Sequence, residues 1–216
     1  MKKIHLIVVS CLLQGCLSEE IPAEPIIIDP PTYISIGRDS LITGEFIGLN
    51  HEEAYRKLQE VEKLEHLNVV GNAVEKFEEL SYRLPLYNYF VFDYQPGSDK
   101  GVQIWMEEGK VKSIFLNSGK ELGQWPEWER EGVRVGESRE AAAEKLANLQ
   151  RRSKYAANFA HTLLGVKDMH EGYDRHLDST PEWYYTKVLS ASRMDVYQLR
   201  FKGDVLDHIL VNKMKK

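Results

Sequence analysis

Six side chains that can bind a metal ion or move a proton lie in one short segment of the sequence. His170 and Glu171 begin like the zinc motif His-Glu-x-x-His, which places two histidines on one face of a helix. Asp174 occupies the position of the second histidine, and Gly172 weakens the helix that would align the ligands. We therefore expect a solvated acidic loop, with a metal-dependent hydrolase as the alternative. The six residues are Asp168, His170, Glu171, Asp174, His176 and Asp178.

The other residues with catalytic side chains are scattered. The sequence contains no G-x-S-x-G elbow and no phosphate-binding P-loop. Its two cysteines, Cys11 and Cys16, both lie near the start, so the body of the chain offers no thiol nucleophile. The remaining histidines of the body stand far apart, at His51, His66, His161 and His208. We expect a protein that is not an enzyme and that holds no metal and no cofactor.

Aromatic residues favour a binding function instead. Residues 87–94 (YNYFVFDY) are apolar at odd and even positions, so a strand here must present one aromatic set to the uncovered side of its sheet. Protein interfaces are enriched in such exposed rings. We predict that a partner binds six of them: Tyr87, Tyr89, Trp105, Phe115, Trp183 and Tyr185. The alternative is that these rings pack under the N-terminal segment or between two parts of the protein.

An internal repeat indicates which elements position these residues. Residues 46–58 (FIGLNHEEAYRKL) align with residues 134–146 (RVGESREAAAEKL) at an offset of 88. Further matches follow in the same order at offsets of 95 or 96, so the second copy has an insertion of about eight residues. Those matches pair 85–91 with 181–187, 102–106 with 197–201, and 114–117 with 209–212.

Each copy begins with the same signal for a helix start. Asn50 in the first copy and Ser138 in the second can accept a hydrogen bond from the first turn of a helix. A glycine stands two residues before each of them, at Gly48 and Gly136. Glu53 completes a capping box in the first copy. A helix is therefore predicted to follow each cap.

A second helix and a hairpin are among the elements that complete each copy. Apolar periodicity predicts a helix over 71–83 and a counterpart over about 153–165. Alternation predicts one hairpin over 101–117, with its turn at Glu108-Gly109, and another over 194–212.

These elements predict an α+β protein of two tandem ααβββ repeats, with antiparallel sheets and helices packed on one face. The first unit covers 37–122 and the second covers 123–216. Two tryptophans lie where the units join, and we expect Trp125 and Trp128 to pack at that junction.

The N-terminus predicts a lipid anchor. Two lysines precede an apolar run, residues 4–13, which is too short to span a bilayer and fits a secretory signal. Residues 13–16 (LQGC) resemble a bacterial lipobox. The resemblance implies a signal peptide over 1–15, cleavage before Cys16 and a lipid on its sulfur. An ordinary secretory signal with an incidental cysteine is the alternative.

A proline-rich tether is expected after the cysteine, over residues 16–36. Its run Ile26–Ile28 leaves open an edge strand packed on the body. Leu17 follows the cysteine, which resembles the lipoproteins sent to the outer membrane. We therefore expect a periplasm-facing protein anchored in the outer membrane.

The formal charge narrows the class of partner. Cleavage would remove two of the 28 basic residues and leave all 33 acidic residues, so the formal charge would change from −5 to −7. An acidic surface disfavours nucleic acid and an anionic membrane surface. We expect a protein partner, no nucleic acid, and membrane contact through the lipid anchor alone.

The segments GLNHEEAYRKL and GESREAAAEKL, with the element order around them, resemble two bacterial families. One is the small outer-membrane assembly lipoproteins (SmpA/OmlA, also called BamE), and the other is the β-lactamase inhibitor protein family, a tandem duplication with a concave binding face. The resemblance covers about 42–120 and 130–213. It implies a non-catalytic envelope lipoprotein that binds and inhibits a protein partner, such as an immunity protein against a toxin. An assembly or structural role is the alternative.

Overall fold

A computed structural model describes residues 32–36, 44–74 and 77–215 of the chain. The expected signal peptide, Cys16 and the run Ile26–Ile28 lie outside these residues. Eleven of the described strands form one sheet, and the other two form a separate hairpin. Every pair of neighbouring strands is antiparallel.

The helices are short and the strands are longer toward the C-terminus. The helical elements are α1 (His51–Lys57), α2 (Phe77–Arg83), α3 (Arg139–Gln150) and α4 (Ser153–Ala156), a π-helical turn at Leu58–Glu62, and 3-10 turns at Gly44–Phe46, Leu84–Leu86, Ala157–Phe159 and Arg175–Ser179. The strands are β1 (Thr32–Ile36), β2 (His66–Val69), β3 (Ala73–Val74), β4 (Tyr87–Asp93), β5 (Val102–Glu107), β6 (Lys110–Leu116), β7 (Glu121–Leu122), β8 (Gln124–Trp125), β9 (Val133–Arg134), β10 (His161–Asp168), β11 (Glu182–Ser190), β12 (Arg193–Lys202) and β13 (Val205–Lys215).

The order of strands is nearly symmetrical about the centre of the sheet. It runs β1-β13-β12-β11-β2-β10-β4-β5-β6-β7, and β3 also pairs with β10. At the centre, β2 from the first copy pairs with β10 from the second. A three-stranded meander flanks each of them, β11 to β13 beside β2 and β4 to β6 beside β10. Both copies therefore contribute to one continuous sheet.

Each half of the sheet is covered by a helix from the other of the two predicted sequence units. Ala54 and Leu58, at the first helix, lie in one core with Trp183, Leu199 and Ile209 of β11, β12 and β13. All five side chains are buried. The first-copy helix thus closes the core of the second-copy strands.

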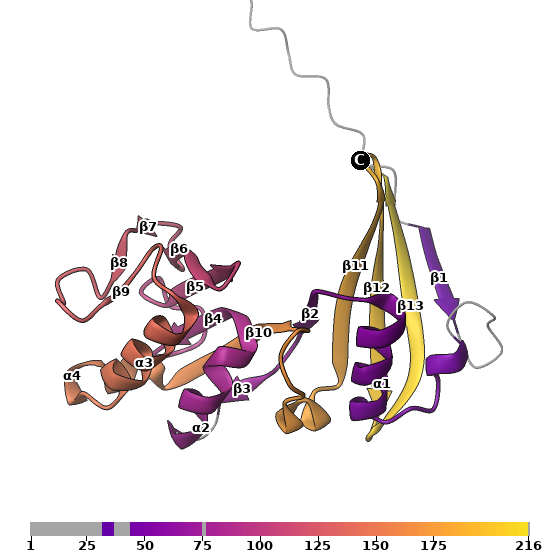
Figure 1. Ribbon diagram of the computed structural model, residues 1–216, viewed down its shortest axis with the longest axis horizontal. Coiled ribbons are helices and arrows are strands. Elements are labelled where there is room, and N and C mark those ends of the chain that lie inside the picture. The colour runs from indigo at the N-terminus through magenta and orange to yellow at the C-terminus, as the bar shows by residue number, and fades with distance from the viewer. Residues whose placement is uncertain (1–31, 37–43, 75–76, 216) are drawn as a thin grey trace, which may run out of the picture.

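The second core is built in the same way, from a helix of one sequence unit and strands of the other. Ala142 and Leu146 of α3 lie in a second core with Phe90, Ile104 and Ile114 of β4, β5 and β6. We call α1, β1, β2 and β11 to β13 the first lobe, and α2, α3, β4 to β6 and β10 the second lobe; Figure 1 shows them side by side, joined through β2 and β10. The lobes therefore do not coincide with the sequence units 37–122 and 123–216.

Both predicted helix starts are confirmed. The Asn50 side chain accepts a hydrogen bond from the Glu53 amide (2.9 Å), and the Glu53 carboxylate accepts one from the Asn50 amide (3.0 Å). Ser138 caps α3 without the reciprocal bond. Gly48 and Gly136 have φ angles of 93° and 89°, which residues with a Cβ rarely adopt.

Both predicted hairpins are also confirmed. β5 and β6 are joined by Glu108 and Gly109, with φ angles of 50° and 70°, and such two-residue turns match the twist of the strands. β12 and β13 are joined at Gly203, with a φ angle of 67°.

The predicted ααβββ order is not confirmed, because a strand stands between the first helix and the meander in each copy. Residues 161–165, predicted as helix, belong to β10, and residues 73–74 form β3. β10 pairs with β2, β3 and β4, so long-range strand pairing overrides the local helical pattern. The coarser prediction, helices mixed with antiparallel strands, is confirmed.

Two further predictions need correction. The last five residues of the expected tether form edge strand β1, with Thr32 opposite Lys213, rather than a free spacer. Trp125 does pack in the second-lobe core, with its ring 5.8 Å from the ring of Phe159. Trp128, which was also expected to pack, is 94 % exposed.

Candidate functional site

One row of side chains crosses the uncovered face of the sheet from β6 to β13. Consecutive members lie directly opposite one another on neighbouring strands, so they share one face. The apolar side chains of the described helices pack in the two cores, on the opposite face. We call this the open-face row: Ser113, Trp105, Tyr89, Val166, Asn68, Tyr184, Gln198 and Leu210.

In the second lobe, hydrogen bonds hold the aromatic end of the row in place. The rings of Tyr89 and Trp105 are 5.7 Å apart and tilted by 52°. The Tyr89 hydroxyl donates to Gln103 (2.8 Å), and the Gln103 amide donates to Asn117 (2.9 Å). Partial burial raises the pKa of Tyr89. A Cβ on Gly165 would lie 2.7 Å from the Tyr89 ring, so this glycine makes room for it.

In the first lobe, a second polar cluster holds Tyr184. Its hydroxyl donates to Glu182 (2.5 Å), and the Gln198 amide donates to both Glu182 (3.0 Å) and the Tyr184 oxygen (2.8 Å). The guanidinium of Arg200 lies 3.1 Å from the other carboxylate oxygen. The hydrogen bond from Tyr184 is the main cause that holds the pKa of Glu182 below its usual value. The side chains are therefore fixed before any partner arrives.

A hollow interrupts the face beside the centre of the row. It has a volume of about 580 Å³ and lies next to Asn68. Residues 62–66 line one side, and Thr186, Lys187 and Val188 line the other. The hollow therefore adjoins the row at Asn68, which lies between Tyr89 and Tyr184 in the row, and a protruding side chain of a partner can fill it.

Three of the six predicted binding residues belong to this face. Tyr89 and Trp105 are members of the row, and Phe115 lies opposite Gln103 in the adjacent row. Each of the three is half-buried.

The other three predicted binding residues are core residues, so that part of the prediction is wrong. Tyr87 and Trp183 have no exposed surface, and Tyr185 is 1 % exposed. An irregularity in the pairing of β4 with β10, at Asn88, turns Tyr87 to the helix side although Tyr89 faces outward. In β11, alternation places Tyr184 outside and its neighbours inside.

Sequence reasoning missed two members of the row, Tyr184 and Gln198, and the polar residues that hold the row, Glu182 in the first lobe and Gln103 and Asn117 in the second. The alternation Glu182-Trp183-Tyr184-Tyr185 carried a usable signal, because the carboxylate marks the outer face.

The acidic segment 168–178 is not a solvated loop at its two key positions. Arg139 donates to Asp168 (2.7 Å), and Asp174 accepts hydrogen bonds from Arg83 (2.9 Å) and from the Tyr87 hydroxyl (2.6 Å). Both carboxylates are buried. Burial alone raises the pKa of Asp168, but hydrogen bonds to the carboxylate from the backbone and from Arg139 bring it below its usual value.

The same segment does not gather its imidazoles and carboxylates around one point. His176 lies 3.6 Å from Glu79 and 3.3 Å from the Tyr82 hydroxyl, whereas Asp168 and Asp174 bind separate arginines. In residues 32–36, 44–74 and 77–215, no three His, Cys, Asp or Glu side chains are placed to hold a metal ion.

Lys167 is buried between the lobes. Its ammonium donates to the Asp168 carbonyl (2.6 Å) and lies 5.4 Å and 5.9 Å from the ring centres of Tyr55 and Tyr87. Burial lowers the pKa of Lys167 to about 8, against the raising effect of Asp168 and Glu171. Because the side chain has no exposed surface, its role is to join the lobes rather than to meet a ligand.

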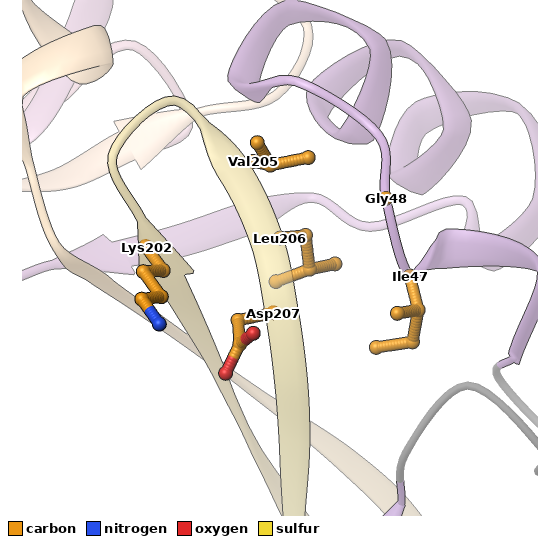
Figure 2. Close-up of a pocket in the computed structure, with 6 residues that line it drawn as sticks. All are labelled: Ile47, Gly48, Lys202, Val205, Leu206 and Asp207. Carbon is orange, nitrogen blue, oxygen red and sulfur yellow. The ribbon is translucent and has the colours of Figure 1, made fainter.

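Figure 2 shows a different hollow, of about 420 Å³, at the turn end of β12 and β13. It forms where the backbone of Gly48 approaches β13 and donates to the Leu206 carbonyl (2.8 Å). Lys202 and Asp207 are the charged residues of its lining. One ammonium and one carboxylate on an otherwise apolar wall do not form a catalytic group, so we do not place the functional site there.

Comparison of the chain with protein-family models, curated proteins and solved structures finds no match. Within the part of the chain that the structure describes, no helix has the length and hydrophobicity needed to cross a bilayer.

Proposed function

We propose that this chain is a non-catalytic envelope lipoprotein that binds a protein partner across the open-face row and inhibits it. The observation that carries the proposal is the row itself. It places three aromatic rings, of Trp105, Tyr89 and Tyr184, on one uncovered sheet face, and hydrogen bonds hold the two tyrosines. Tryptophan and tyrosine are the residues that most often dominate binding energy at protein interfaces.

Rigidity of the row supports binding with little loss of conformational entropy. Ordering a flexible side chain on binding costs roughly 0.5–1.5 kcal/mol. The Tyr89 and Tyr184 hydroxyls are already bound to Gln103 and Glu182 in the free chain. The sheet beneath them is continuous through both lobes. A partner would therefore meet a surface whose shape is set in advance.

Inhibition fits the charge of the chain. A formal charge of −5, or −7 after cleavage before Cys16, favours rapid encounter with a basic protein. An acidic, anchored protein that plugs the basic cleft of a secreted enzyme would protect the envelope from it. The most specific form of the proposal is an immunity protein against a toxin, anchored by a lipid at Cys16 in the outer membrane and facing the periplasm.

The test is capture of partners from envelope extract with the full chain. We expect a captured protein to be lost when Trp105→Ala and Tyr184→Ala are combined. The matched control is Trp128→Ala, because this ring is 94 % exposed but lies in the β8–β9 hairpin segment. Deletion of the gene for the present protein should then make cells sensitive to the captured protein.

Two results would count against the proposal. If the double variant still retained the captured protein, the open-face row would not be its binding surface. Recovery of barrel-assembly components alone, with permeability defects in the deletion strain and no toxin, would favour an assembly role. Palmitate labelling of the wild type, and its loss in Cys16→Ser, tests the anchor separately.

A further inference from the structure

The first lobe ends in a tip that extends past its core. Strands β11, β12 and β13 continue to residues 190, 193 and 215, and Figure 1 shows the C-terminal end of the chain at this tip. Val188, Leu189 and Met214 are 73 %, 46 % and 37 % exposed there. Exposed apolar side chains gathered in one patch mark a surface that contacts a protein or a membrane.

The apolar residues of the tip form one group. Val188 lies opposite Met194, and Met194 lies opposite Met214, so the three side chains share the open face at the end of the sheet. Leu189 follows Val188 at an irregularity in the pairing of β11 with β12.

Basic residues outnumber acidic ones in the strand segments at the tip of a chain that is acidic overall, and one of them, Lys187, is ion-paired with Glu62 (2.9 Å). Residues 186–196 and 212–215 contain four basic residues, Lys187, Arg193, Lys213 and Lys215, and one acidic residue, Asp195. The formal charge of the whole chain is −5. The negative net charge disfavours contact of the body with anionic lipid. The tip differs, because its local charge is positive.

The expected anchor approaches the body beside the same tip. Thr32 pairs with Lys213, so the chain before β1 joins the sheet at its tip end. Cys16 precedes Thr32 by sixteen residues, and a chain of that length spans at most roughly 50 Å. A lipid at Cys16 would therefore hold the tip within reach of the bilayer.

We propose that the tip rests on the bilayer that holds the lipid, with Val188, Leu189 and Met214 in the boundary between headgroups and acyl chains. Arg193 and Lys213 then lie among anionic headgroups, which attract basic residues. This inference rests on the anchoring part of the proposed function. It goes further by setting the orientation: the strands of the first lobe stand upright, and Tyr184, four residues before Val188, lies roughly 13 Å farther from the membrane.

The experiment uses the lipidated full-length chain in vesicles of phosphatidylethanolamine and phosphatidylglycerol. A Leu189→Cys variant carries an environment-sensitive fluorophore at the tip. The control carries the same fluorophore through Val135→Cys, because Val135 is 45 % exposed and follows β9, outside the first lobe. We expect a blue-shifted emission and quenching by lipid-borne bromine atoms at position 189, and neither at position 135.

Two further measurements separate the parts of the proposal. Val188→Glu with Arg193→Glu in the labelled chain should abolish the shift at position 189 and leave the melting temperature unchanged. Vesicles of phosphatidylcholine alone should give a smaller shift, and an equal shift would overturn the role of the basic residues. Flotation with vesicles but an unshifted probe at 189 overturns the tip contact alone. Failure to float overturns the anchoring and, with it, the tip contact.

Discussion

The ring of His51 stacks on the ring of Phe201, with centroids 3.8 Å apart and an interplanar angle of 13°. The first residue begins α1, in the first copy of the repeat, and the second lies in β12, in the second copy. His51 is also 3.1 Å from the carbonyl oxygen of Thr180. The cores of this protein are thus built from both copies together.

This exchange predicts that neither half of the sequence folds alone. A fragment of residues 32–122 lacks the strands that α1 covers, and a fragment of residues 123–216 lacks the strands that α3 covers. We expect each to show little regular structure by circular dichroism, and an equimolar mixture to recover the spectrum of the whole chain. Cooperative unfolding of either fragment by itself would contradict the exchanged packing.

Two tryptophans should differ sharply in their contribution to stability. Trp183 has no exposed surface, and its indole donates to the Thr180 hydroxyl (2.7 Å), so Trp183→Ala should cost about 3–5 kcal/mol of unfolding free energy. Trp105 is half-buried on the open face, and Trp105→Ala should cost about 1 kcal/mol. Urea unfolding measures both. Equal losses would show that the Trp105 ring belongs to a core.

Loss of one arginine should leave a buried carboxylate without its counter-ion. Arg139→Met removes the guanidinium that lies 2.7 Å from Asp168, and we expect a loss of about 3–5 kcal/mol. Adding Asp168→Asn should recover most of it, because the amide carries no charge. Arg56→Met is the control: its partner Glu52 is exposed, and the expected cost is below about 0.5 kcal/mol. The prediction fails if the double variant is no more stable than Arg139→Met.

Burial of Lys167 predicts a rise of stability with pH. Its folded pKa is about 8, against an unfolded value of 10.5. Well below pH 8 the lysine is protonated in both the folded and the unfolded chain. In that range its titration does not change the unfolding free energy with pH. Between about 8 and 10.5 the unfolded chain holds a proton that the folded chain has lost, so the unfolding free energy rises with pH.

The whole increment over that window is about 3 kcal/mol. The measurement compares the wild type with Lys167→Met by urea unfolding from pH 7 to about 9.5, before tyrosines titrate in the unfolded chain. We expect the rise in the wild type and not in the variant. If the unfolding free energy rose equally in both proteins, titratable groups other than Lys167 would be the cause.

Local signals accounted for much of the fold. Asn50 and Ser138 accept amide hydrogen bonds at the starts of α1 and α3, and Glu108-Gly109 turns its hairpin, because caps and tight turns depend on a few neighbouring residues. The side to which Tyr87 points did not follow, since β4 carries apolar residues on both faces and its pairing with β10 is irregular at Asn88. There the partner strand decides which side is inside.

The sequence by itself determined the helix caps, the hairpins, the repeated order of helix and meander, and the charges of the chain, because each follows from residues close together or from composition. Only the tertiary structure decided that β2 and β10 meet at the centre, that α1 and α3 cover strands of the other copy, and that Asp168 and Asp174 bind buried arginines. The physical reason is that the apolar periodicity of a helix shows which of its faces is buried but not which strands cover that face. Which copy it covers is set by pairing between residues far apart in the chain.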